Sequence, residues 1–440
     1  MSDPRTEYQQ RVARAYRWNF CACTIDGGVF SFAMSLLSPV VVLPYYVKLL
    51  SGSEVLSGAI YTLYALGRSL PQIMAANMVK HRSRRKPFMI WMALLERGGI
   101  AVILLSTLLI QPSETSWSLM AFFGGYALLT LSLGLMSPAW LDFLAKAIYK
   151  RRGTFFGVLN ATGGILSILG GIAFSALTRL YPFPFHFTAA FGLAFAVSLI
   201  SLAALMAYRE VPSPFLASST SMGEHLRSLP ALLRNDRNFR YFILSRAVIG
   251  VADAGVPFYA IYATRRIAGA ASEVAAFNLA LMISQAVSTL VWGYLGDRYG
   301  YRLIYRVAAV MGFATASLTL LVSDLSGYLL IFTLLGGTLG GLIIADSNLV
   351  LELSPREQTP TYVGMMNAVL GPVTGLAPLL GGVLATTWGY PAIFITAMIA
   401  QAAGWVGMST LVREPREVPG PRATQTREGA PAVSEERERS

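Results

Sequence analysis

Charge is scarce in this sequence. Only 13% of its 440 residues are Asp, Glu, Lys or Arg, and 54% are hydrophobic, whereas soluble domains are about 25% charged. The hydrophobic residues form continuous runs of about 20 residues, the length that crosses a bilayer as a helix. These runs do not alternate with polar residues, so they do not fit the strands of a barrel. The sequence therefore predicts an all-α membrane protein.

Cysteine and histidine are scarce too. Cys21 and Cys23 lie two residues apart in the first apolar run, where helical side chains do not face each other, so no disulfide is expected. The three histidines lie in loops or at the ends of runs. The chain has no H-E-x-x-H, no G-x-S-x-G, no Cys/His metal spacing and no ATP-binding loop. We therefore expect no cofactor, no metal, no enzyme activity and no direct ATP-driven pumping.

The apolar runs predict twelve transmembrane helices. Their predicted ranges are 20–47, 55–79, 87–110, 117–145, 154–178, 185–208, 239–262, 272–296, 302–323, 326–352, 360–388 and 390–411. These ranges divide the chain into two six-helix halves, 20–208 and 239–411. We expect residues 1–19 to be a cytoplasmic N-terminus and 209–238 a cytoplasmic linker with a short amphipathic helix. We expect residues 412–440 to form a disordered, charged cytoplasmic tail.

The basic residues are distributed unevenly between the two sides of this map. Of the 35 Lys and Arg residues, 28 fall in the termini, the linker and the loops of one side, and four fall in the loops of the other. Basic residues accumulate in cytoplasmic loops, so both termini are predicted to lie in the cytoplasm and the protein in the cell membrane. Because this topology explains the net charge of +12, no nucleic-acid partner is expected.

One loop carries a distinct motif, Gly293-Tyr-Leu-Gly-Asp297-Arg298-Tyr-Gly300-Tyr-Arg302. A degenerate copy lies 217 residues earlier, at 76–85. Taken alone, such a stretch could be an ordinary short basic loop between two membrane helices. It resembles the G-x-L-x-D-R-x-G-x-R/K loop of the major facilitator superfamily of secondary transporters. Two copies at half-chain spacing predict two related halves.

Further internal matches agree with this spacing. Asp26-Gly-Gly-Val in the first span matches Asp253-Ala-Gly-Val in the seventh, at an offset of 227 residues. Residues 154–161 in the fifth span match 361–368 in the eleventh, at an offset of 207. Two parallel, pseudo-symmetric six-helix halves are what the resembled fold contains.

The resemblance implies a monomeric transporter in the lipid bilayer that binds a small-molecule substrate, and in many members protons, between its halves. It also implies cytoplasmic gate residues. In the second half these are Gly293, Asp297, Arg298, Gly300 and Arg302, with Glu352 as a partner. In the first half they are Arg84 and Arg85, which would meet Asp142.

Three carboxylates lie inside predicted spans: Asp26, Asp253 and Asp346. A charge at the bilayer centre costs about 3 kcal/mol, so each needs a partner or a function. They could bind protons or cations in a central cavity, and Asp346 has a polar neighbour in Asn348. The alternative is that Asp26 and Asp253 are structural residues beside glycine-rich kinks.

Arg68 and Glu96 also lie near mid-span. The plainer interpretation is a neutralising Arg68–Glu96 pair. The other interpretation makes Arg68 an anchor for an anionic substrate, since guanidinium suits carboxylate or phosphate. Arg246 is expected to reach the cytoplasmic surface along its own span. Trp140, Tyr259 and Gln285 are further candidates for lining the site.

The sequence thus predicts a secondary active transporter that works by alternating access. A transporter-like protein without transport activity, acting as a sensor or assembly factor, is the alternative. Uptake of a small metabolite and efflux of an amphipathic compound both remain open.

Overall fold

The structure is a computed structural model that describes residues 4–80, 84–108, 115–212, 233–234, 236–267, 273–355 and 359–414. These residues are helical apart from short connections, and none of them forms a strand. The helices are α1 (Pro4–Leu36), α2 (Val42–Ser51), α3 (Glu54–Lys80), α4 (Lys86–Leu108), α5 (Thr115–Ala147), α6 (Arg152–Leu180), α7 (Phe185–Met206), α9 (Arg237–Val251), η1 (Ala252–Gly255), α10 (Phe258–Arg266), α11 (Val274–Tyr299), α12 (Tyr301–Leu321), α13 (Leu325–Leu353), α14 (Thr359–Thr387) and α15 (Tyr390–Thr410).

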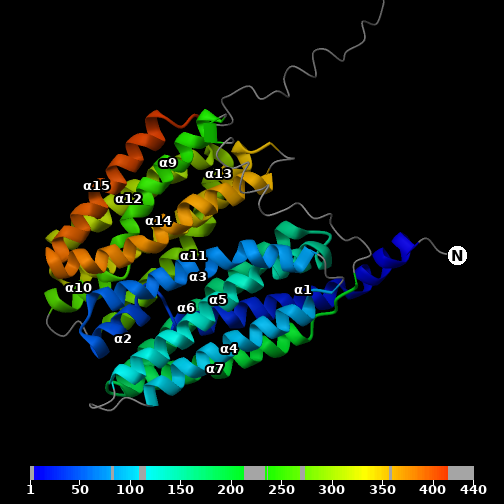
Figure 1. Cartoon of the computed structure of the whole chain (residues 1–440), viewed down its shortest axis with the longest axis horizontal. Helices are drawn as coiled ribbons and strands as arrows, with labels where there is room; N and C mark the ends of the chain where they lie inside the picture. Colours follow the sequence, from blue (N-terminus) through cyan, green and yellow to red (C-terminus); the bar gives the residue numbers. More distant parts are fainter. Residues whose placement is uncertain are drawn as a thin grey trace, which may run out of the picture.

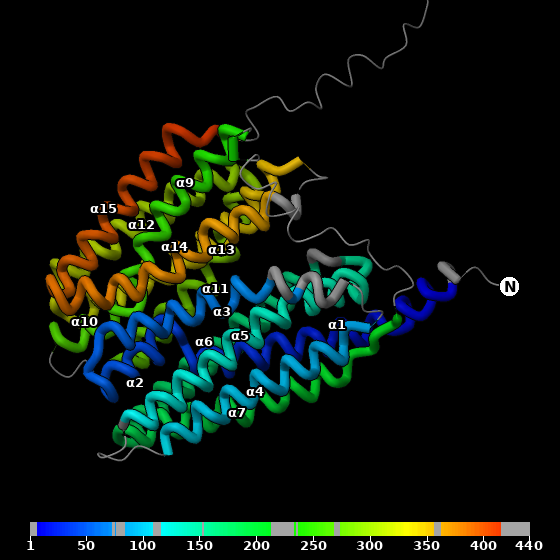
Figure 2. The backbone as a smooth tube through the Cα atoms, viewed as in Figure 1, coloured from blue at the N-terminus to red at the C-terminus, as the bar shows by residue number. Residues whose placement is uncertain are grey.

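The helices form two groups, α1 to α7 and α9 to α15, which follow each other along the chain (Figures 1 and 2). The groups converge at the end that holds α2 and α10, and they spread apart toward the end that holds the N-terminus (Figure 1). Contacts between α3 and α14, between α6 and α11, and between α2 and α10 join the groups. The inner faces of these helices therefore meet along the middle of the molecule.

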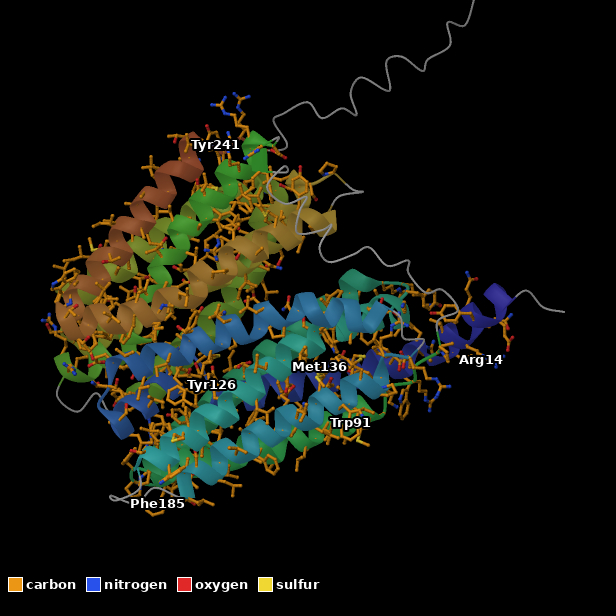
Figure 3. The ribbon with its side chains drawn as sticks, in the orientation of Figure 1. Arg14, Trp91, Tyr126, Met136, Phe185 and Tyr241 are labelled. Carbon is orange, nitrogen blue, oxygen red and sulfur yellow. The ribbon has the colours of Figure 1, made fainter. Side chains whose placement is uncertain are left out.

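The outer faces of the groups are apolar. Trp91 on α4, which is labelled in Figure 3, is for example 66% exposed. In the described part of the chain, ten helical stretches are long and apolar enough to cross a membrane. The protein is therefore a multi-pass membrane protein. The count of twelve stays a prediction, because α1 and α3 are not among those ten stretches.

The first and seventh predicted spans are each broken, which the sequence analysis did not predict. The span expected at 20–47 begins earlier, within α1, and stops at Leu36 before α2 starts at Val42. The span expected at 239–262 stops at Val251, passes through η1 and resumes at Phe258. Pro39 and Pro257 lie in these breaks. Proline has no N–H for the helical ladder, so it favours interruption at these points.

The breaks correct the proposed match between Asp26 and Asp253. Asp26 lies inside α1, well before its break, whereas Asp253 lies in η1, within the break itself. Pro39 and Pro257 are 218 residues apart, close to the 217 of the loop motif. The prolines therefore mark equivalent positions, and the four-residue match of the two aspartates was a coincidence of register.

The predicted amphipathic linker helix and the tail fall largely outside the described residues, which include only 209–212, 233–234 and 236–238 of the linker and 412–414 of the tail.

The loop motif forms a turn of one residue. Gly300 separates α11 from α12 with φ +89° and ψ 150°, a region that is essentially restricted to glycine. A Cβ atom there would lie 2.6 Å from Glu414 Oε1. At Gly293, earlier in the same motif, a Cβ atom would meet nothing within 4 Å.

We expect Gly300→Ala to lower the free energy of unfolding by about 1–3 kcal/mol, because alanine would strain this backbone and crowd Glu414. Gly293→Ala is the matched control and should be neutral or slightly stabilising, since alanine is the better helix former. Thermal unfolding of the two purified variants in detergent compares them. Equal melting temperatures would show that the turn does not depend on Gly300.

Candidate functional site

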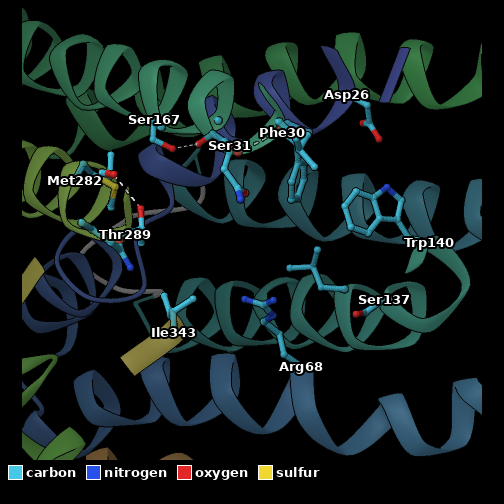
Figure 4. A pocket seen from close by; sticks show the side chains of 18 of the residues that line it. Asp26, Phe30, Ser31, Arg68, Ser137, Trp140, Ser167, Met282, Thr289 and Ile343 are labelled. Carbon is cyan, nitrogen blue, oxygen red and sulfur yellow. Dashed lines mark hydrogen bonds between the residues drawn. The ribbon is translucent and has the colours of Figure 1, made fainter. Parts of the chain in front are cut away.

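A central cavity lies between the two groups of helices. It has two adjoining compartments of about 640 Å³ and 470 Å³. The larger is lined by Asp26, Glu96 and Arg97, and the smaller by Arg246, Asp253 and Asp346. Six residues line both compartments: Ser31, Arg68, Ser167, Met282, Gln285 and Ile343. Figure 4 shows five of these six around one shared space. Helices from both groups therefore build one site.

Asp26 is held by two hydroxyl groups contributed by α7 and the residues just after it. Its carboxylate oxygens accept hydrogen bonds from Ser201 Oγ at 2.5 Å and from the Tyr208 hydroxyl at 2.6 Å. Ser201 Oγ in turn accepts from Arg97 Nη2 at 2.8 Å. Arg97 Nη1 lies 2.8 Å from Glu96 Oε1. The first compartment thus contains one connected network with two carboxylates and a single guanidinium.

The expected Arg68–Glu96 pair is wrong. Glu96 pairs with its neighbour Arg97, and its side chain is 1% exposed. Arg68 instead donates to the Tyr64 hydroxyl at 2.7 Å and lies over the Tyr64 ring, 5.3 Å from its centroid. The adjacent arginine on α4 meets Glu96 without a crossing between helices, which leaves Arg68 free to face the cavity.

The second compartment has a matching network. Arg246 Nε and Nη2 bind the two oxygens of Asp346 at 2.8 and 3.0 Å, in the bidentate geometry that suits guanidinium and carboxylate. The Tyr305 hydroxyl also donates to Asp346. The expectation that Arg246 reaches the cytoplasmic surface is wrong: its side chain is 6% exposed because Asp346 holds it inside.

Asp253 differs from the other carboxylates. It is 9% exposed and lines the second compartment. Within the described residues, its carboxylate has no hydrogen bond or ion pair, although the charges of Arg246 and Asp346 act on it. The second compartment is therefore lined by two carboxylates and two guanidinium groups, of which only Asp346 and Arg246 form an ion pair.

Of the remaining candidates for lining the site, two line the cavity and two do not line either compartment. Trp140 lines the first compartment, and Gln285 lines both. Tyr259 is 3% exposed and packs on Phe394, with ring centroids 5.0 Å apart. Asn348 donates its amide to the Ile344 carbonyl of its own helix and is not among the residues that line either compartment.

The first-half gate candidates meet within their own group of helices. Arg85 Nε lies 2.7 Å from Asp142 Oδ2, and Lys146 Nζ lies 2.8 Å from the same oxygen. Glu210 accepts hydrogen bonds from the backbone N–H groups of Arg85 and Lys86. Arg84 is exposed. These contacts tie the start of α4 to the end of α5.

The second-half gate candidates surround the turn at Gly300. Arg302 donates to the carbonyls of Met408 and Ser409 at the end of α15, at 3.0 and 2.5 Å. Asp297 accepts from the Tyr301 hydroxyl at 2.5 Å. Arg298 lies on the Tyr299 ring. The pairing of these residues with Glu352 stays a prediction.

Sequence reasoning missed a charged cluster at the opposite end. Glu54, at the start of α3, accepts from Lys48 Nζ at 2.5 Å in its own group and from Arg265 Nη2 at 2.9 Å in the other group. Glu54 is 6% exposed. The signal was present in the sequence, because Lys48 and Arg265 are two of the four basic residues that the predicted topology places in the loops of that side.

Known proteins share this sequence pattern and this fold. The profile of the Major Facilitator Superfamily matches residues 244–435. "Multidrug resistance protein MdtG" of Salmonella paratyphi A is 25% identical over 385 residues, which cover 84% of this chain and 89% of that protein.

Solved transporters share the fold at low sequence identity. A point mutant of the nucleoside transporter NupG superposes with a TM-score of 0.67 at 15% identity, covering 88% of this chain and 98% of that one. A D-xylose-proton symporter superposes with a TM-score of 0.69 at 12% identity, covering 91% and 99%. Together with the two groups of helices around a central cavity, these matches make the chain similar over most of its length to transporters of the Major Facilitator Superfamily.

Proposed function

We propose that this protein is a proton-coupled secondary transporter whose substrate binds in the two-compartment cavity and whose coupling group is Asp253. The observation that carries the proposal is that Asp253 lines the cavity without a hydrogen bond or ion pair among the described residues, because Arg246 pairs with Asp346.

The physical argument is the cost of unpaired charge. Asp346 is neutralised by the bidentate contact with Arg246. Asp253 has no cation within ion-pair distance in the described chain, and an isolated charge at mid-membrane costs about 3 kcal/mol. Binding a proton removes this cost. Because Asp253 lines the cavity, the proton can be exchanged with whichever side the cavity faces.

The two ends of the molecule supply the alternation. The Lys48–Glu54–Arg265 cluster joins the two groups at one end, whereas the groups spread apart at the N-terminal end (Figure 1). The basic residues favour a cytoplasmic location for that N-terminal end. We therefore propose that this conformation faces the cytoplasm, in a cell or inner membrane, and that the Glu54 cluster must break to open the other side.

Export is the first candidate for the direction of transport. The relative named a multidrug resistance protein favours export of amphipathic compounds, and the apolar cavity wall with Phe30, Met136 and Trp140 suits such compounds. The solved proton symporter with the same fold carries a sugar, so uptake is the second candidate. A role without transport is not favoured, because the chain retains Asp26, Asp253 and Asp346 around the cavity.

We expect Asp253→Asn to keep ligand binding within about tenfold of the unchanged protein but to abolish stimulation of transport by a pH gradient. Asparagine has a similar shape and cannot exchange a proton. A thermal-shift screen of metabolites and amphipathic drugs first supplies a ligand. Transport of that ligand is then measured in proteoliposomes with and without an imposed pH gradient.

Asp324→Asn is the matched control, because Asp324 lies outside the cavity and its role as N-cap of α13 can be taken over by asparagine. It should respond to the gradient normally. Equal gradient responses from both variants would remove Asp253 from the coupling step.

We expect Glu54→Gln to favour opening of the end that holds α2 and α10, because it removes the carboxylate that bridges the two groups. Spin labels at Leu49→Cys and Leu325→Cys, in a background with Cys21 and Cys23 replaced, report the separation across this end. The longer-distance population should grow in Glu54→Gln. Glu7→Gln, which breaks an exposed pair within α1, is the control. An unchanged distance distribution in Glu54→Gln would show that this cluster does not hold the end closed.

A further inference from the structure

The six residues that line both compartments form a boundary ring, and one of them is charged. Of its six residues, Arg68 is charged, Ser31, Ser167 and Gln285 are neutral and polar, and Met282 and Ile343 are apolar. Ser31, Arg68 and Ser167 come from α1, α3 and α6 of the first group, and the other three come from α11 and α13 of the second. A molecule at this boundary touches both halves, and the only charge it meets in the ring is positive.

Arg68 has no acidic partner within the part of the chain that the structure describes. Its hydrogen bond goes to the Tyr64 hydroxyl, a neutral group. Its side chain is exposed, and because it lines both compartments this exposed surface faces the cavity. Figure 4 shows it pointing from α3 into the space opposite Ser31 and Phe30.

The carboxylates that line the cavity either bind other side chains or lie beyond ion-pair distance from Arg68. Asp26 is held by Ser201 and Tyr208, Glu96 by Arg97, and Asp346 by Arg246. Asp253 lines one compartment with Arg68, but the two do not form an ion pair. Arg68 is therefore a cation in a low-dielectric cavity without a counter-ion, a situation that is costly until an anion binds.

The neighbours of Arg68 suit an anion that hydrogen-bonds. Tyr61 and Tyr64 line the second compartment beside it. The Tyr64 hydroxyl accepts from Arg68 and keeps its own hydrogen for donation. Gln285 and Ser31 in the ring can also donate. On the first-compartment side, Phe30 and Trp140 offer aromatic surface (Figure 4).

We propose that the substrate is an amphipathic organic anion, whose carboxylate, phosphate or phosphonate group binds Arg68 at the boundary ring while its apolar part packs against Phe30 and Trp140. This proposal rests on the proposed transport function, because it names the substrate class of the same cavity. Guanidinium binds planar and tetrahedral oxyanions through two parallel hydrogen bonds, which ammonium cannot do. Arg68 thus selects against cationic and neutral compounds of the same size.

The test uses four probes that share one aromatic ring and differ in charge: benzoate, phenylphosphonate, benzamide and benzylamine. Binding to the purified full-length protein in detergent is measured by thermal shift and by calorimetry, with no membrane gradient. The anions should stabilise the protein, and benzamide and benzylamine should not. In Arg68→Gln the affinity for the anions should fall by about tenfold to a hundredfold, as expected for a lost charge-assisted hydrogen bond. Arg68→Lys keeps the positive charge but cannot form two parallel hydrogen bonds, so it should retain part of the affinity for the anions.

Arg97→Gln and Asp253→Asn separate the possible failures. Arg97 is already paired with Glu96, so Arg97→Gln, if it folds, should lose less anion affinity than Arg68→Gln. Asp253→Asn should still bind the anions, even where it no longer couples transport to protons. Stabilisation by benzylamine instead of the anions, anion binding that survives in Arg68→Gln, or no stabilisation by either anion would each overturn the proposal. None of these results would bear on the coupling role of Asp253, which is tested by the measurement with and without a pH gradient.

Discussion

The structure depends on one constraint, the cost of leaving a charge without a partner away from water. Two networks meet this constraint in similar ways, with Arg97 serving Asp26 and Glu96 on one side, and Arg246 serving Asp346 on the other. Asp253 has no hydrogen bond or ion pair among the described residues. Arg68, which lines both compartments, has no acidic partner in the same part of the chain. We propose that the cavity meets the constraint by exchanging a proton at Asp253 and by binding an anion at Arg68.

The breaks at Pro39 and Pro257 give the cavity its shape. Each interrupts the first long span of its group, and in the second group η1, which lies in this interruption, places Asp253 at the cavity wall. The short helices that follow, α2 and α10, carry Lys48 and Arg265 to Glu54 and close one end. The breaks, where Asp253 lines the cavity, thus lie next in the chain to the helices whose contacts with Glu54 must open.

Much of the fold could be predicted from the sequence, because apolar length and the asymmetry of Lys and Arg are properties of the chain itself. Span ends from Glu54 to Thr410 agree within a few residues, apart from the break of the seventh span. The site was less predictable, since it depends on which side chains meet across helices. Glu96 met Arg97 instead of Arg68, and Arg246 turned inward to Asp346. Four-residue matches such as that of Asp26 with Asp253 also could not distinguish true repeats from coincidence.

The most direct test of the account is an infrared difference spectrum of the purified protein between acidic and alkaline pH. Carboxyl groups absorb at a different frequency when they hold a proton, so the spectrum reports exchangeable acids without knowledge of the substrate. The account predicts a protonated-carboxyl band in the unchanged protein that is smaller in Asp253→Asn and keeps its full size in Asp324→Asn. A band of full size in Asp253→Asn, or no such band in the unchanged protein, would contradict the account.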